Sequence, residues 1–172
     1  MSFQAYDLKN YRSIAAMSEE TECFTADLWV DGKKFAHVSN DGRGGCDRFQ
    51  PYPPHTMADE RALSARLVAE NPGSRHFDGP GSAVESLTMI LKTRTDLIKK
   101  MRTAVVFIDG SDVKALKTRD KSAPDQRHFD HILQAHPGSR ILNQMDVNEA
   151  AVAWVDAEFA SIDQAASQPF TP

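Results

Sequence analysis

The segment HVSNDGRGGCDRF, residues 37–49, concentrates polar residues and glycines that could bind an anion. Glycine allows a backbone with positive φ and a close approach to a ligand, and successive N–H groups in such a backbone can form an anion-binding nest. Arg43 and Arg48 would reinforce it. The segment lacks the Lys-Ser/Thr pair and the following helix of a P-loop, so a bulged strand end or a wide turn is the simpler interpretation. The predicted binding residues of this loop are Asn40, Asp41, Gly42, Arg43, Gly44 and Gly45.

Two groups of side chains have the chemistry of metal ligands. The first could form a zinc site and contains Cys23, His37, Asp41, Cys46 and Asp47. In the second, Asp109 and Asp112 follow an apolar segment, where α/β folds place Mg²⁺ ligands. We favour free cysteines with a capping histidine for the first group, and an Asp-capped glycine turn for the second. No metal ligand, catalytic residue or cofactor is therefore predicted.

The segment HFDH places His128 and His131 three residues apart on an expected helix, with Asp125 and His136 nearby. Zinc-binding histidines on a helix are usually four residues apart, and the sequence contains no HExxH motif. The apolar stripe of this helix would consist of Phe129, Ile132 and Leu133. We therefore expect His128 at the border of the stripe and His131 on the polar side.

The glycine loop follows a predicted β-hairpin. Residues 22–30 and 33–39 are rich in β-prone side chains, and Asp31-Gly32 between them favours a turn in which both residues have positive φ. Counting outward from the turn pairs Leu28 with Phe35. The core face would then carry Phe24, Ala26, Leu28 and Phe35. In this register His37 points toward the core, and Trp29 lies on the exposed face.

Helices and strands alternate farther along the chain. The sequence predicts helices over 57–70 and 83–101, a third helix with Pro124 near its first turn that ends at about 136, and a fourth that Asp146 opens and that ends at about 162. It also predicts strands over 104–110 and 140–143. The order in the second half favours a small parallel βαβ element with a right-handed crossover. The predicted fold class is α+β, with an N-terminal hairpin or meander, two amphipathic helices and a C-terminal βαβα element. We expect one domain with a β-rich part at 1–50, a helical part at 56–102 and a βαβα part at 103–165.

Composition excludes several classes of protein. The chain of 172 residues has a net charge of −4 with interspersed charges, which argues against a broad basic surface for nucleic acid. No apolar run approaches the ~20 residues that a membrane helix needs, so no membrane partner is expected. The first residues lack the pattern of a signal peptide. These features favour a cytoplasmic location and two free thiols.

The segment SEETECFTADLWVDGKKFAHVSNDGRGG, residues 18–45, resembles the N-terminal hairpin of small uncharacterised proteins of phages, prophages and plasmids. Those proteins carry a SEET-x-CF entry, a DG-type turn and a SNDGxGG exit. MRTAVVFIDG followed by HPGSRILNQ is similar to their closing segment. The resemblance covers about half of the chain. It does not supply an enzyme activity or an established ligand. It implies an accessory protein of a mobile element, a class that often binds and blocks, or modifies, a host or competitor protein.

The leading hypothesis is therefore that the protein binds a macromolecular partner, such as a protein of a host defence system. Trp29 and the 40–45 loop would form the binding surface, because Trp and Arg are favoured interface anchors. The alternative is a small-ligand binder or a metal-dependent enzyme that holds an anionic substrate on the same loop. In that alternative Asp41, Asp47 or Asp109 would hold Mg²⁺. A third hypothesis is nucleic-acid binding, which the net charge does not favour.

Overall fold

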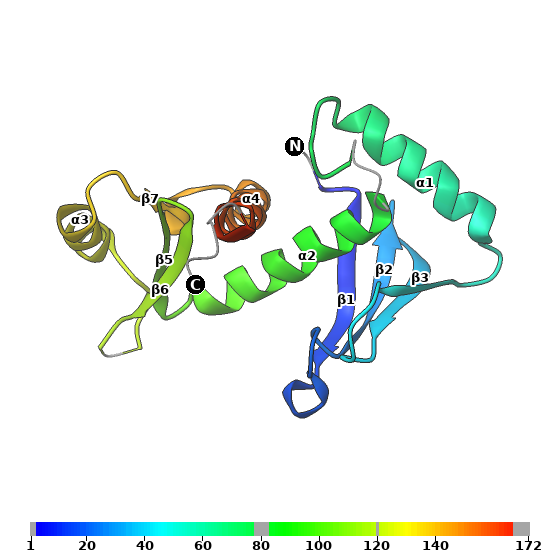
Figure 1. Ribbon diagram of the computed structural model, residues 1–172, viewed down its shortest axis with the longest axis horizontal. Helices are drawn as coiled ribbons and strands as arrows, with labels where there is room; N and C mark the ends of the chain where they lie inside the picture. The colour runs from blue at the N-terminus through cyan, green and yellow to red at the C-terminus, as the bar shows by residue number, and fades with distance from the viewer. Residues whose placement is uncertain (1–2, 78–82, 120, 167–172) are drawn as a thin grey trace, which may run out of the picture. The chain divides into compact units, whose positions relative to one another are not determined.

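The computed structural model describes residues 3–77, 83–119 and 121–166 (Figure 1). Within these ranges the chain forms four α-helices and two antiparallel sheets, which confirms the predicted α+β class. The chain divides into two compact units, Met1–Lys92 and Thr93–Pro172, with the boundary inside helix α2 (Ala83–Lys100). None of the helices in the described ranges has the length and apolar character needed to cross a membrane.

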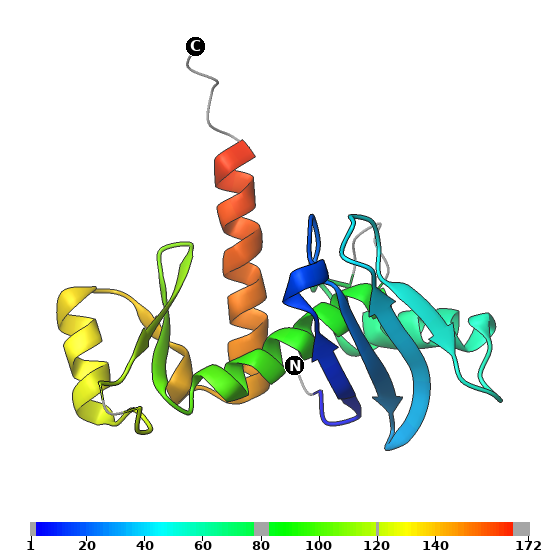
Figure 2. The same ribbon diagram turned by 90° about the horizontal axis from the view of Figure 1, so that it is seen from below.

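The first unit is built on a four-stranded antiparallel sheet in the order β1-β2-β3-β4 (Figure 2). Its strands are β1 (Tyr6–Ser13), β2 (Phe24–Val30), β3 (Lys33–Asn40) and β4 (Arg48–Pro51). Asp31 and Gly32 form the predicted hairpin turn, with φ angles of 50° and 75°. Helix α1 (Met57–Glu70) begins at Thr56, whose side chain forms a capping box with Asp59.

A β-bulge changes the predicted register of the β2–β3 hairpin. The pairing begins as expected next to the turn, but the register shifts between Leu28 and Trp29. Leu28 consequently pairs with Ala36 and not with Phe35, which is the extra residue of the bulge. A shift of one residue moves every later side chain of a strand to the opposite face of the sheet.

The bulge therefore reverses the predicted faces of β3 from Ala36 onward. Ala36 and Val38, which the predicted register would place on the face opposite to Phe35, are 0% and 1% exposed and lie in the core. His37, which we expected to point toward the core, lies opposite Asp27 on the other face. The prediction for His37 was wrong because counting from a turn assumes an uninterrupted ladder, and no local sequence pattern marks this bulge.

The second unit contains a three-stranded sheet in the order β6-β5-β7. Its strands are β5 (Ala104–Asp109), β6 (Asp112–Lys117) and β7 (Arg140–Ile141). β7 pairs with β5 in the antiparallel sense, so the predicted parallel βαβ element was wrong. The reason is β6, a strand that the sequence analysis did not predict. Because β6 reverses the chain once more before helix α3 (Gln126–Ala135), β7 runs opposite to β5.

Helix α3 packs on this sheet through a small apolar cluster. Val105, Phe107, Ile132 and Ile141 form the cluster, and Phe129 packs against it. Helix α4 (Val147–Ala166) follows β7 and begins at Asp146, whose Oδ1 accepts the backbone N–H of Asn148 at 2.9 Å. The packing fixes one face of α3 against the sheet, so the neighbouring residues of the helix border the outer strand β6.

Candidate anion-binding cleft

The side chain of Asn40 organises the predicted binding loop. Asn40 is buried, and its Oδ1 accepts hydrogen bonds from Thr21 Oγ1 at 2.8 Å and from the Gly42 N–H at 2.9 Å. Its Nδ2 donates to the carbonyl of Gly45 at 3.2 Å and to Asp47 Oδ1 at 3.0 Å. The structure thus gathers residues 40–45 into a compact turn around one amide side chain.

Gly42 and Gly44 join this turn to the segment that precedes β2. The carbonyl of Gly42 accepts backbone N–H groups from residues 19–21 at 2.8, 3.0 and 3.3 Å. The Gly44 N–H donates to Thr21 Oγ1 at 3.3 Å. Three N–H groups of the predicted anion nest, those of Gly42, Arg43 and Gly44, therefore already donate hydrogen bonds inside the protein. The polar density of the loop has a structural explanation in these contacts.

The other predicted binding residues lie apart from one another. Arg43 is exposed at the tip of the turn, and Asp41 pairs with Arg48 at 2.7 Å. Trp29 lies near the hairpin turn at the far end of β2, about 17 Å along the strand from the residue paired with Asn40. The Nζ of Lys9 lies 3.8 Å from the centroid of its ring. Trp29 and the glycine loop thus occupy opposite ends of the hairpin.

The candidate metal ligands have other partners. Asp109 contacts Lys114 Nζ at 2.7 Å and His136 Nδ1 at 2.9 Å. The hydrogen bond from Lys114, together with that from His136, lowers the pKa of Asp109. Both cysteines are free, Cys23 buried and Cys46 exposed. Across the described residues, no three His, Cys, Asp or Glu side chains are grouped so that they could hold a metal ion.

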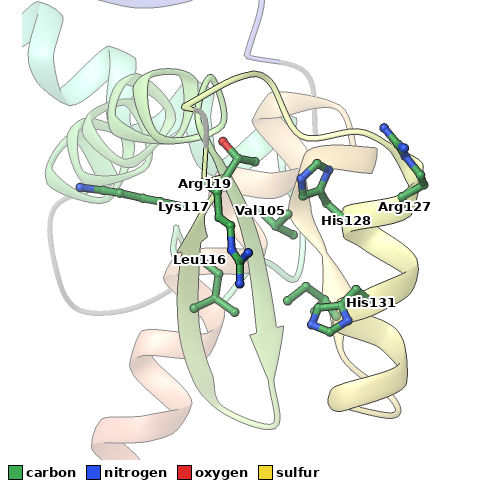
Figure 3. Close-up of a pocket in the computed structure, with 9 residues that line it drawn as sticks. Val105, Leu116, Lys117, Arg119, Arg127, His128 and His131 are labelled. Carbon is green, nitrogen blue, oxygen red and sulfur yellow. The ribbon is translucent and has the colours of Figure 1, made fainter.

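The second unit contains a cleft that the sequence analysis missed. It has a volume of about 830 Å³ and is bordered by β6 and α3 (Figure 3). Figure 3 shows Arg119, His128 and His131 directed into the space between strand and helix, whereas Lys117 and Arg127 point away from it. The lining consists of the apolar Val105, Leu116 and Ile132, the basic Lys117, Arg119 and Arg127, the two histidines, and Thr118.

The backbone at Arg119 is positioned by the residue before it. Thr118 is buried, its N–H donates to the carbonyl of Thr103 at 3.0 Å, and its Oγ1 donates to the carbonyl of Ser122 at 2.8 Å. Within the described ranges Arg119 has no ion-pair partner, whereas Arg127 pairs with Asp125 at 2.8 Å. Arg119 is therefore a cation that is directed into the cleft and can receive an anion.

His128 is held by the residue that caps its own helix. Asp125 is the N-cap of α3, and its Oδ1 lies 2.7 Å from His128 Nδ1. The Asp125 N–H also lies 3.3 Å from the same nitrogen. The hydrogen bond from Arg127, together with that from His128, holds the pKa of Asp125 well below its usual range. Asp125 is thus an ionised acceptor that orients the imidazole.

The sequence contained part of the evidence for this cleft. Four basic residues occur within 114–121, and the histidines of the HFDH segment, His128 and His131, follow a few residues later. Their relation depends on β6, because only that strand brings Arg119 opposite the helix that carries the histidines. Because β6 was not predicted, nothing in the sequence indicated that the basic residues and the histidines lie close together.

The cleft combines charged and apolar side chains in one space. Its distinctive features are a guanidinium and two imidazoles around an apolar floor. Comparisons with protein-family models, with curated proteins and with solved structures find no match to this chain.

Proposed function

We propose that the protein binds a nucleotide unit of a nucleic acid in the cleft between β6 and α3. The observation that carries this proposal is the position of Arg119, which lies in the cleft without an ion-pair partner among the described residues. A guanidinium matches the geometry of phosphate and binds it through paired hydrogen bonds. The apolar floor offers a surface for the face of a base, as in sites that bind single strands by stacking and charge.

The net charge of −4 does not oppose this proposal, because the charge near the cleft has the other sign. The charged residues that line the cleft, Lys117, Arg119 and Arg127, are all basic. A local basic patch can attract phosphate on a protein that is acidic as a whole. The volume of about 830 Å³ lies within the range of about 300–1,000 Å³ that is usual for ligand sites.

A nucleic-acid ligand agrees with the role in a phage, prophage or plasmid that the resemblance implies. That role stays a prediction, as does binding of a protein partner through Trp29 and the 40–45 loop. Arg43 in that loop and Arg119 in the cleft are both exposed arginines, so they allow the two surfaces to be compared directly.

Replacement of Arg119 by alanine is expected to weaken binding of a fluorescently labelled single-stranded DNA by about 10- to 100-fold. This range follows from the loss of a charged hydrogen bond worth about 1.5–3 kcal/mol. Arg43→Ala is the matched control, because it removes the same charge from the first unit and should leave the dissociation constant unchanged. Fluorescence anisotropy at two salt concentrations measures both effects, since binding to phosphate weakens with salt.

Three outcomes of the comparison would contradict the proposal. If wild-type protein does not bind the oligonucleotide at low salt, the cleft does not take a nucleotide. If Arg119→Ala and Arg43→Ala bind as tightly as each other, the phosphate is not bound at Arg119. A loss confined to Arg43→Ala would instead favour the glycine loop as the binding surface.

A further inference from the structure

The two histidines of the cleft lie on one face of helix α3. His128 and His131 are three residues apart, which places their Cβ atoms about 5–6 Å from each other. Both line the cleft, and Figure 3 shows both imidazoles on the side of α3 that faces the sheet. Histidine is the side chain best suited to accept and donate protons near neutral pH. The pair therefore places two groups that can accept or donate a proton on one wall of the cleft.

The contact with Asp125 determines which nitrogen of His128 is available. An ionised carboxylate only accepts hydrogen bonds, so the 2.7 Å contact with Asp125 Oδ1 requires a proton on His128 Nδ1. This contact outweighs the longer one of 3.3 Å from the Asp125 N–H, which would need an unprotonated Nδ1. In the neutral imidazole Nε2 is then the basic nitrogen. His131 is exposed to solvent.

Arg119 comes from the strand side of the same cleft. Figure 3 shows its side chain extending along the sheet toward Leu116, on the side opposite the two imidazoles. A guanidinium beside a phosphate stabilises negative charge that develops on it in the transition state. A base, an acid and a cation thus border one space that has an apolar floor.

We infer that this cleft cleaves the backbone of RNA, with His128 as general base and His131 as general acid. The inference rests on the proposed binding of a nucleotide in the cleft. His128 Nε2 takes the proton of the 2′-hydroxyl, and O2′ forms a bond to phosphorus. The bond from phosphorus to O5′ breaks, and His131 gives its proton to O5′. The products are a 2′,3′-cyclic phosphate and a 5′-hydroxyl. One proton is taken and one is given, so the step consumes no other reactant.

Cleavage of a labelled single-stranded RNA in the presence of EDTA tests this inference. Wild-type protein is expected to produce 2′,3′-cyclic phosphate ends, and His128→Ala and His131→Ala to lower the rate by about 100-fold or more, within the range of general acid–base catalysis. His37→Ala is the matched control, because it removes an imidazole from the first unit and should leave the rate unchanged. All four proteins are purified in parallel, so that a contaminating nuclease would act equally in each.

Binding of single-stranded DNA separates this inference from the proposed function. DNA lacks the 2′-hydroxyl, so it should bind to the wild type and to both cleft-histidine variants without being cut. If the wild type binds DNA but does not cleave RNA, the catalytic inference is wrong and the binding proposal stands. If it binds neither DNA nor RNA, both are wrong. Cleavage that persists in both histidine variants contradicts the assignment of the catalytic residues.

A substrate with sulfur in place of the bridging 5′-oxygen distinguishes the roles of the two histidines. A thiolate leaves without protonation, so this substrate should restore cleavage by His131→Ala but not by His128→Ala. Restoration of the opposite variant, or of neither, would contradict the assignment.

Asp125→Asn tests the positioning role of Asp125. Asparagine is also a good N-cap, so helix α3 should be retained. The variant is expected to have a lower cleavage rate with unchanged binding of DNA. An unchanged cleavage rate would show that Asp125 only caps the helix.

Discussion

Gly42→Ala is expected to destabilise the protein by about 3–5 kcal/mol, the range of severe single substitutions. A Cβ atom at this position would lie 2.2 Å from the carbonyl oxygen of Met17 and 2.9 Å from Cys23 Cβ. The backbone carbonyl cannot rotate away as a flexible side chain could. Relief of this contact would separate the loop from residues 19–21, whose N–H groups bind the carbonyl of Gly42.

Gly45→Ala is the control that separates this clash from backbone strain. Gly42 and Gly45 have similar φ angles of +83° and +96°, but a Cβ atom at Gly45 would have no neighbour within 4 Å. Alanine at Gly45 should therefore cost only about 1–2 kcal/mol, the strain of a left-handed backbone. Urea unfolding measures both variants. Equal destabilisation by the two substitutions would show that the contact with Met17 is not important for stability.

Asp27→Asn is expected to destabilise the protein by about 1.5–3 kcal/mol, the value of hydrogen bonds to a charged group. Asp27 is only 6% exposed, although it lies on the outer face of the first sheet. Its carboxylate accepts hydrogen bonds from Asn10 Nδ2 and Tyr52 Oη, both at 2.6 Å. Lys34 Nζ lies 3.2 Å away. An asparagine can accept some of these bonds but carries no charge for Lys34.

The same carboxylate predicts a pH dependence of stability. Burial by itself would raise the pKa of Asp27, but hydrogen bonds from Tyr52, Asn10 and Lys34 outweigh this effect and lower it from 3.8 to about 2. The folded protein then binds fewer protons than the unfolded chain between about pH 4 and pH 2. The contribution of Asp27, about 2 kcal/mol, is complete above pH 4 and is lost as the pH falls through 2.

Urea unfolding of wild type and Asp27→Asn between pH 6 and pH 2 measures this contribution. The difference in the free energy of unfolding between the two proteins should shrink by about 2 kcal/mol over that range. Asp31→Asn is the matched control, because Asp31 pairs with Arg66 at a solvent-exposed site, where ion pairs contribute about 0–1 kcal/mol. A difference that is constant with pH would contradict the assigned role of Asp27.

The sequence by itself determined the features that depend on neighbours along the chain. The Asp31-Gly32 turn and helix α1 over residues 57–70 agree with the prediction, and Thr56 and Asp59 form the capping box at the start of that helix. The turn is set by the φ angles that its two residues must adopt. The helix is set by the unpaired N–H groups at its start, which the cap satisfies, and by the spacing of its apolar residues. The α+β class follows from the order of such elements.

Only the tertiary structure decided the features that depend on partners far apart in the chain. The bulge at Phe35 places His37 beside Asp27, and β6 makes β7 antiparallel to β5. The packing of α3 on that sheet brings its two histidines opposite Arg119. None of these contacts alters the local pattern of charge or hydropathy. The sequence therefore drew attention to the glycine loop, where chemically distinctive residues are adjacent, and not to the cleft, which folding assembles from separate segments.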